Sequence, residues 1–497
     1  MYPMKFYRQF LITTLVSIVL AGCMVGPDFH SPASPKTNTY TGSPLPAKTV
    51  GTKTASDGEK SQHFYLVSGQ EIPAAWWSLY HSDALNALIC IGLANSPNLA
   101  AAQASLRQAE ETFNAQIGTS LYPSVGVQLT GERQRLSSAG FGGDFASTTF
   151  NTYNASVNVS YTLDFFGAAR RQIESLGAQI DYQNFLLEAS YLTLTSNIVT
   201  TAVTIASLKA QIQATQQIIQ SETDQLAIVK KQFNLGGASG SDVYSQETQL
   251  GQTRASLPPL EQSLAQNLHA LSVLVGALPN ENKYPELTLS QLHLPKNLPV
   301  SLPSSLVRQR PDIRASEALL HAASAQVGVA TANLYPQITL TGAYGYENQT
   351  IANIFTAHNI AWNYGASLLQ PIFNGGALRA KKRAAVAGLE QAAAQYRQTV
   401  LQAFQNVADT LRALQNDAKA LKAEKEAEIA AKKTLTMTQE QFKLGGVSFL
   451  SLLIAQRQYQ QTRIDLIKAQ AARYADTAAL FQALGGGWWN RKCCITS

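Results

Sequence analysis

Apolar and polar residues alternate along two pairs of short segments in this chain. From 153 to 163 every odd position is apolar and every even position is polar. A period of two is typical of a β-strand with one dry face and one wet face. The pattern predicts four strands, at 124–135, 153–164, 337–347 and 361–373. The stretches 134–151 and 348–360 are rich in Gly, Ser, Thr, Asn and Phe, which indicates exposed hairpin loops.

Each pair of predicted strands is followed by a very long helix. Residues 168–233 and 377–442 contain no proline and are rich in strong helix formers such as Ala, Gln, Leu, Lys and Glu. At 1.5 Å per residue each stretch extends ~100 Å, so it must pack along its length against other helices. Further helices are expected at 312–334, from the first glycine turn to 276, and at 448–484.

Three landmarks recur in the same order about 210 residues apart, which indicates an internal repeat. SLYP at 120–123 returns as NLYP at 333–336, Phe166 is matched by Phe373, and QFNLGG at 232–237 returns as QFKLGG at 441–446. The copies differ at Pro258-Pro259, which the second copy lacks. These prolines are predicted to kink or end their helix, so that one helical hairpin can move more than the other.

The first residues predict export and lipidation. Lys5 and Arg8 precede an apolar run from 10 to 20, and small residues lead into Cys23. This arrangement resembles the bacterial lipoprotein box, which implies cleavage before Cys23, a diacylglycerol on its thiol and a palmitoyl group on its new amine. Met24 stands where an inner-membrane retention signal has Asp, which implies the outer membrane. A cytosolic rod with a small sandwich would share the helices but not the export signal.

Composition and motifs exclude other classes. After the signal there is no second apolar run of about twenty residues, so no transmembrane helix is expected. The formal charge of +6 is mild and scattered, which does not favour nucleic acid. Cys90 is expected to fill a small space in a core, and Cys493-Cys494 to lie in a frayed tail, with an interchain bridge as the alternative. No catalytic or metal-binding motif is present, so no enzyme, metal or cofactor beyond the lipid is expected.

Four strands with unpaired edges cannot face lipid alone. They must close with strands of other chains, and known barrels begin near eight strands. Two or three protomers satisfy this requirement, and three would give twelve strands. A passive lipoprotein tether would need the helices and the anchor but has no use for the strands.

Four runs together resemble the TolC-type outer-membrane efflux proteins, in their NodT-like lipoprotein branch. They are CMVGPDF at 23–29, RPDIR at 310–314, NLYP at 333–336 and ALGGGW at 483–488. The resemblance spans essentially the mature chain. It implies an α+β fold: a homotrimer with a twelve-stranded outer-membrane barrel, a long periplasmic α-helical barrel and an equatorial domain.

The expected division of the chain follows the repeat. It comprises a signal peptide (1–22), an anchored extended segment (23–82), a first repeat (83–297), a second repeat (298–484) and a tail (485–497). The resemblance further implies the exit duct of a tripartite efflux pump for small molecules. Its partners would be a periplasmic membrane-fusion adaptor and a proton-driven inner-membrane pump of the resistance-nodulation-division type.

The two glycine turns are expected to lie at the periplasmic tip. A glycine pair after a helix is ordinarily a C-cap, and the resemblance adds that these turns meet the adaptor. The turn residues are Leu235, Gly236, Gly237, Leu444, Gly445 and Gly446.

A pore gate is implied just beyond the turns. Its candidate residues are Asp242, Phe442, Leu450, Ser451 and Ile454. Asp242 matches an acidic residue of the family, although a charge at a helix N-terminus explains it equally well. Ser451 and Ile454 stand where relatives often carry aspartates. A hydrophobic ring of Leu450 and Ile454 would then close the pore, with weaker cation block and selectivity than in acidic-ring relatives.

Overall fold

The computed structural model describes residues 24–37, 39–42, 48–50, 65–136, 147–281, 284–295 and 297–491. Two compact units are present. Unit 1 contains the chain up to Pro32, Ser105–Asn184 and Ala315–Arg397, and unit 2 contains Ala33–Ala104, Phe185–Arg314 and from Gln398 onward. The two units do not correspond to the two sequence repeats that the predicted boundary near 298 separates. Each unit combines segments of both repeats. Cys23, Cys493 and Cys494 lie outside the described residues.

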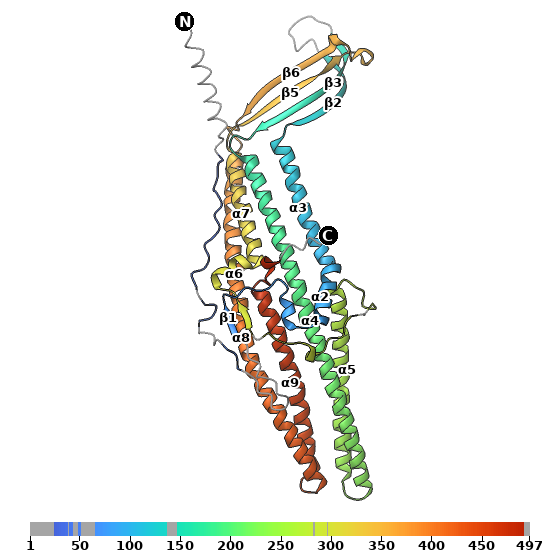
Figure 1. The fold of residues 1–497 in the computed structure, drawn as a ribbon. Coiled ribbons are helices and arrows are strands. Elements are labelled where there is room, and N and C mark those ends of the chain that lie inside the picture. Colours follow the sequence, from blue (N-terminus) through green and yellow to red (C-terminus); the bar gives the residue numbers. More distant parts are fainter. Residues whose placement is uncertain are drawn as a thin grey trace. The chain divides into compact units, whose positions relative to one another are not determined.

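Unit 1 contains a four-stranded antiparallel sheet (Figure 1). Its strands, in the order in which they pair, are β2 (Ser124–Leu136), β3 (Thr148–Leu163), β5 (Gln337–Asn348) and β6 (Ile360–Leu369). The registers run without interruption from Ser124↔Ser160 to Leu136↔Thr148. β6 ends four residues earlier than predicted because Pro371 follows, and proline has no N–H for the ladder.

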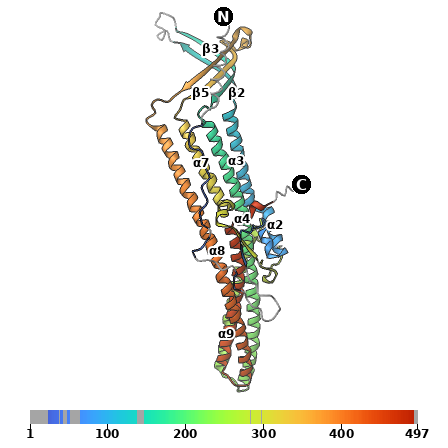
Figure 2. The same ribbon diagram turned by 60° about the vertical axis from the view of Figure 1, so that its left-hand side comes forward.

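The long helices repeat with one constant offset. α4 (Ala168–Asn234) and α8 (Ala377–Lys443) each have 67 residues, while α5 (Gly240–Leu274) and α9 (Phe449–Ala483) each have 35. α8 begins and ends 209 residues after α4, and α9 begins and ends 209 residues after α5. In unit 2, α5 runs beside α4 and α9 beside α8 (Figures 1 and 2).

The prediction that Pro258-Pro259 could end its helix is wrong, because α5 continues through both prolines. Both side chains are exposed. Arg254 and Ala255, whose carbonyls lose their helical N–H partners, are exposed residues. Water can therefore satisfy these carbonyls, and the loss is local. α5 and α9 consequently have the same length despite the difference in sequence.

Shorter elements complete the two units. They are β1 (Tyr65–Ser68), α2 (Asp83–Asn95), α3 (Pro97–Leu121), β4 (Asn297–Val300), α6 (Pro303–Gln309) and α7 (Pro311–Ala332). β1 and β4 pair in parallel. Trp76, Tyr80 and Phe481 are buried in the core of unit 2, with Trp76 stacked on Phe481.

Cys90 was expected in a core, and this prediction is wrong. α2 buries Leu85, Leu88, Ile89 and Gly92, while Cys90 is exposed. The helical period explains the difference: Cys90 follows Ile89 by about 100°, which turns it off the buried stripe.

Two runs singled out in the sequence meet in unit 2. Arg310 is 8% exposed, and its Nη1 donates to the carbonyl of Ala483 at 2.9 Å. Trp488 Nε1 donates to the carbonyl of Gln309 at 2.6 Å. The RPDIR and ALGGGW runs therefore form one junction between the start of the second repeat and the end of α9.

Of the described helices, α4 has an 18-residue window apolar enough to cross a membrane by length and composition. The bent pair α2 and α3 passes the same test if it is taken as one span. In α4, 61% of that window is buried inside the protein. A buried core helix gives the same signal, so the window is weak evidence for a span.

Candidate functional site

The two helical hairpins end in nearly identical turns. In the first, Gly236 has φ +77° and the N–H of Gly237 donates to the carbonyl of Gln232 at 2.8 Å. In the second, Gly445 has φ +73° and the N–H of Gly446 donates to the carbonyl of Gln441, also at 2.8 Å. A left-handed glycine with these bonds is a helix C-cap.

A leucine is presented at the end of each turn. Leu235 and Leu444 precede the left-handed glycines, and each is 86% exposed. An apolar side chain this accessible, repeated on two hairpins, favours contact with another molecule. The turn residues predicted at the tip thus form two matching exposed points.

Asp242 caps the helix that follows the first turn. Its Oδ2 accepts from the backbone N–H of Ser239 at 3.0 Å, and its own N–H donates to the Ser239 hydroxyl oxygen at 3.2 Å, so the two residues form a capping box. Ser451 is the equivalent residue 209 positions later, and its N–H donates to the hydroxyl of Ser448. The helix-terminal role of Asp242 is therefore observed, and a role in the gate stays a prediction.

A small apolar core holds the two hairpins together near these turns. It consists of Val229, Val243, Phe449, Leu452 and Leu453, with Phe442 packed against it. The rings of Phe442 and Phe449 lie 5.7 Å apart, edge to face. Phe442 thus stabilises the hairpin pair and does not share the outer surface with the other gate candidates.

Leu450 and Ile454 lie on the opposite side of α9 from this core. They are four residues apart, one turn of helix, and are 63% and 59% exposed. Ser451 is also exposed. Three of the predicted gate residues therefore share one accessible, mainly apolar surface.

A buried polar cluster joins the hairpins further from the tip. Glu222 on α4 is 2% exposed, and its Oε1 accepts from Gln249 Nε2 of α5 at 3.2 Å. Arg457 of α9 donates to Gln249 Oε1. Burial raises the pKa of the Glu222 carboxyl, against the lowering by its hydrogen bonds and by Arg457. These polar contacts fix the relative register of three helices.

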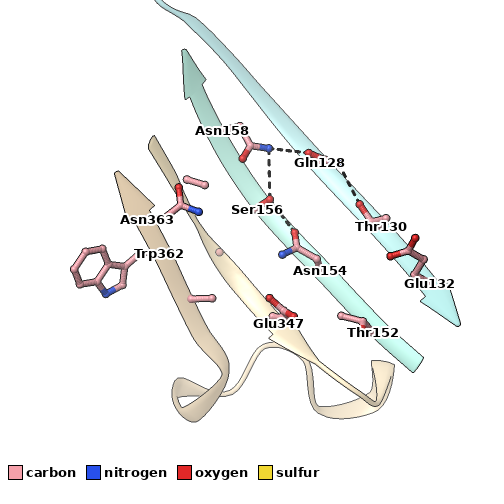
Figure 3. A pocket seen from close by; sticks show the side chains of 13 residues that line it. Gln128, Thr130, Glu132, Thr152, Asn154, Ser156, Asn158, Glu347, Trp362 and Asn363 are labelled. Carbon is pink, nitrogen blue, oxygen red and sulfur yellow. Dashed lines mark hydrogen bonds between the residues drawn. The ribbon is translucent and has the colours of Figure 1, made fainter. Parts of the chain in front are cut away.

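The sheet has two chemically different faces. On one face, polar side chains line a hollow of about 360 Å³ (Figure 3). There Asn158 donates to Gln128 at 3.1 Å, and Ser156 donates to Asn154 at 2.8 Å. Trp362 points away from this group (Figure 3).

The other face is apolar and accessible. Its exposed side chains include Val125, Val127, Leu129, Tyr344, Trp362, Tyr364 and Leu368. Val127 and Leu129 are each 75% exposed. A sheet with one polar face and one exposed apolar face is typical of a barrel wall between water and lipid.

The segment after Cys23 is fixed to unit 1. Met24 contacts Gly167, and the N–H of Val25 donates to the carbonyl of Phe166 at 3.2 Å. Residues 24–32 are here called the anchor segment. This segment begins beside the junction between β3 and α4.

Arg171 secures the anchor segment further along. This side chain is 1% exposed and contacts Asp28 at 2.6 Å and Glu174 at 2.7 Å. Its pKa is raised because the two carboxylates outweigh the effect of burial. His321 contacts Glu174 at 3.0 Å and stacks on Phe29.

Sequence reasoning missed Arg171 and Glu222. Both are charged residues within the long helix α4, where other charged residues stand nearby and give the same sequence signal. Their helical positions alone do not reveal which neighbour they meet, so only the packing identifies them. Among the described residues, no group of His, Cys, Asp and Glu is arranged to hold a metal ion.

Comparison with known proteins gives consistent matches. The family described as outer membrane efflux protein matches residues 88–277 and 302–486. Pyoverdine export outer membrane protein OpmQ of Pseudomonas aeruginosa is 30% identical over 439 residues, covering 86% of this chain and 91% of that protein. Nodulation protein T of Rhizobium leguminosarum is 29% identical over 487 residues, covering 96% and 93%. The outer-membrane channel OprN has a similar structure, with a TM-score of 0.83, 25% identity, and coverage of 94% and 100%.

Proposed function

Because the chain belongs to the outer membrane efflux protein family, we propose that it is the exit duct of a tripartite efflux pump. It resides in the outer membrane with a large periplasmic portion. It passes small molecules such as drugs or toxic compounds, which the pump selects. The observation that carries this function is the two-faced sheet, polar on one side and apolar on the other, joined directly to paired helical hairpins.

Closure of the sheet requires further copies of the chain. β2 and β6 are the edge strands of the four, and an unpaired edge cannot be left in lipid. Three protomers close a barrel of twelve strands, with the polar faces around a water-filled lumen. Three copies of each long hairpin then continue the duct into the periplasm.

The periplasmic adaptor binds the two hairpin tips. Leu235 and Leu444, with their glycines, are the exposed points that support this contact. Photo-cross-linkers at these two leucines should capture the adaptor, while one at the exposed Thr248 should capture much less. Equal capture at all three positions would contradict tip-specific docking.

The gate is a hydrophobic ring formed by Leu450 and Ile454 of three protomers. Their shared exposed surface supports this arrangement, and dewetting of such a ring closes a pore without charge. Divalent cations added to a planar bilayer should therefore block conductance only weakly. Strong block that an Asp242→Asn variant relieves would instead show that an acidic ring forms the gate.

Cys23 carries the lipid, an S-diacylglycerol and an N-palmitoyl group, and the chain uses no other cofactor and catalyses no reaction. The fixed start of the anchor segment supports this proposal, because the Val25 N–H is bonded to the Phe166 carbonyl at the foot of the sheet.

Single-channel recording tests the proposed function. The purified trimer in a planar bilayer should show stepwise openings of uniform conductance. A passive tether would be stably inserted but silent. Absence of conductance from correctly assembled trimer, even with adaptor added, would exclude the exit duct.

A further inference from the structure

The four charged residues on the four sheet strands are separated by sign. Glu132 on β2 and Glu347 on β5 belong to the polar face and line its hollow. Arg133 and Arg135 occupy the alternate positions on β2 and therefore point to the opposite face. The β2–β3 register contains no bulge, so the alternation is maintained up to Leu136. On the described strand residues, both acids face the lumen and both bases face outward.

The outward face changes from apolar to basic along β2. Val125, Val127 and Leu129 come first, then Gly131 beside Tyr153 of β3, and then the two arginines. On β3 the apolar outward positions run from Leu163 to Tyr153. Ten residues at ~3.4 Å and a ~45° tilt span ~24 Å along the membrane normal, which equals the apolar height of a barrel. Arg133 and Arg135 stand just beyond this band.

The direction of the strands places the arginines at the outer leaflet. α3 leads into the start of β2, at Ser124, and the arginines lie near the opposite end of that strand. Ser124 pairs with Ser160, near the end of β3 from which the chain continues into α4. The arginines are therefore at the end remote from the helices, and the helices are periplasmic. The two arginines therefore lie at the level of the outer-leaflet headgroups.

The position of Arg135 is fixed by a hydrogen bond at the rim of the sheet. Its Nη2 donates to the hydroxyl of Ser147 at 2.8 Å. A guanidinium has five N–H donors, so this bond leaves donors available to a ligand. Arg133 is exposed two residues away on the same face.

We propose that Arg133 and Arg135 form a binding site for phosphate groups of the anionic glycolipid in the outer leaflet. This inference rests on the proposed function only for the placement of the chain in the outer membrane. Paired guanidiniums match phosphate oxygens in geometry and charge. The acyl chains of the same lipid lie against Leu129 and Val127, the apolar outward residues of β2 nearest the arginines, so one lipid molecule contacts both the basic and the apolar part of this face.

Retention of a defined lipid tests the site. The full-length trimer is reconstituted in phosphatidylcholine nanodiscs that contain bis-phosphorylated lipid A, and the lipid A that remains bound after delipidation is quantified. Arg133→Gln/Arg135→Gln should retain on the order of 25-fold less than wild type, since each base near a membrane surface contributes about a factor of five. Equal retention would overturn the proposal.

Matched variants separate this site from general charge effects. Lys432→Gln/Lys433→Gln removes the same charge from an exposed part of α8 and should retain lipid A like wild type. Arg133→Lys/Arg135→Lys keeps the charge but loses the forked donors that pair with phosphate oxygens, so it should retain clearly less lipid A than wild type. If the lysine variant retains as much as wild type, charge alone holds the lipid and a phosphate site built from paired guanidiniums is refuted.

Two further arms identify the ligand source. With dephosphorylated lipid A the difference between wild type and the glutamine variant should disappear, and its persistence would contradict phosphate recognition. Inorganic phosphate at millimolar concentration should displace little lipid A, and full displacement would indicate a site for free phosphate instead. Single-channel conductance is recorded in parallel. If the glutamine variant retains lipid A like wild type while wild type conducts normally, this inference alone is refuted. If wild type itself does not conduct, the exit duct is refuted.

Discussion

Gly485, Gly486 and Gly487 form a tight backbone junction in unit 2. All three have positive φ, at +94°, +68° and +71°. A Cβ on Gly485 would lie 2.8 Å from the carbonyl oxygen of Gln309, and one on Gly487 would lie 2.4 Å from that of Ile72. Only glycine accepts both the left-handed conformation and the close approach. Close packing against neighbouring backbone, as well as the turn itself, therefore requires glycine in this run.

Replacement of Gly487 by alanine should destabilise the protein by about 2–4 kcal/mol, from strain at positive φ together with the collision. Thermal unfolding of the purified trimer measures the change. Gly388→Ala is the matched control, because Gly388 lies in α8 with open space at its Cβ position. It should be neutral or slightly stabilising. A Gly487→Ala midpoint equal to that of the control would refute the packing argument.

Asp417 on α8 is a half-buried carboxyl that interacts with Asp476 on α9. Burial, followed by the contacts with Asp476, raises its pKa to about 7, although Arg473 opposes the shift. The folded protein then holds a proton that the unfolded chain releases near pH 4. The contribution of the protonated Asp417 carboxyl to the free energy of unfolding is complete below about pH 4 and is lost as the pH rises to about 7.

Asp417→Asn keeps a neutral side chain at every pH. We expect it to raise the thermal midpoint relative to wild type at pH 8, and the difference to shrink at pH 5. Asp409→Asn, at an exposed position of the same helix, should change neither value. A constant difference between wild type and Asp417→Asn across this range would show that the carboxyl does not titrate there.

The sheet and the hairpins were predictable as elements because their patterns are local. Period-two alternation identified β2, β3, β5 and β6, with small errors at strand ends, and the proline-free stretches identified α4 and α8. The repeated landmarks predicted a period of about 210 residues, and the helices have a uniform offset of 209. The prolines of α5 were misjudged because their effect depends on solvent access to the preceding turn, which the sequence does not show.

The polar face of the sheet predicts the ion preference of the barrel. Glu132 and Glu347 line its hollow and give six carboxylates in a trimer. A ring of carboxylates concentrates cations. Glu132→Gln/Glu347→Gln should therefore reduce cation preference, measured as a smaller reversal potential in a salt gradient. Arg133→Gln, on the same strand but the opposite face, should leave the reversal potential nearly unchanged. An unaltered potential in the double glutamine variant would place selectivity elsewhere.

At the scale of the whole molecule, the anchor segment and the sheet meet at one end of the sheet in unit 1. The anchor segment starts beside Phe166, at the end of β3 that leads into α4, and is secured through Arg171 and Asp28. The described part of the anchor segment thus begins next to the inner end of the apolar band. Several acyl chains hold a protein on a membrane far more firmly than one.

Intact mass measurement tests the anchor. The wild-type chain should lack residues 1–22 and carry the mass of a diacylglycerol and one further acyl group. Cys23→Ala should carry neither and should be recovered less efficiently in the outer-membrane fraction. An unmodified wild-type chain that begins at any residue other than Cys23 would show that this cysteine is not the anchor.

The sequence by itself determined the elements, the internal repeat and the two glycine turns, because alternation, helix propensity and left-handed glycine depend on neighbours close in the chain. Its motifs also identified the family, which the family match and the similarity to nodulation protein T confirm. Only the tertiary structure decided which residues meet. Phe442 turned inward to Phe449, Cys90 lay outside, and Arg310 reached Ala483 because long-range packing selects among the faces that a helix or strand offers.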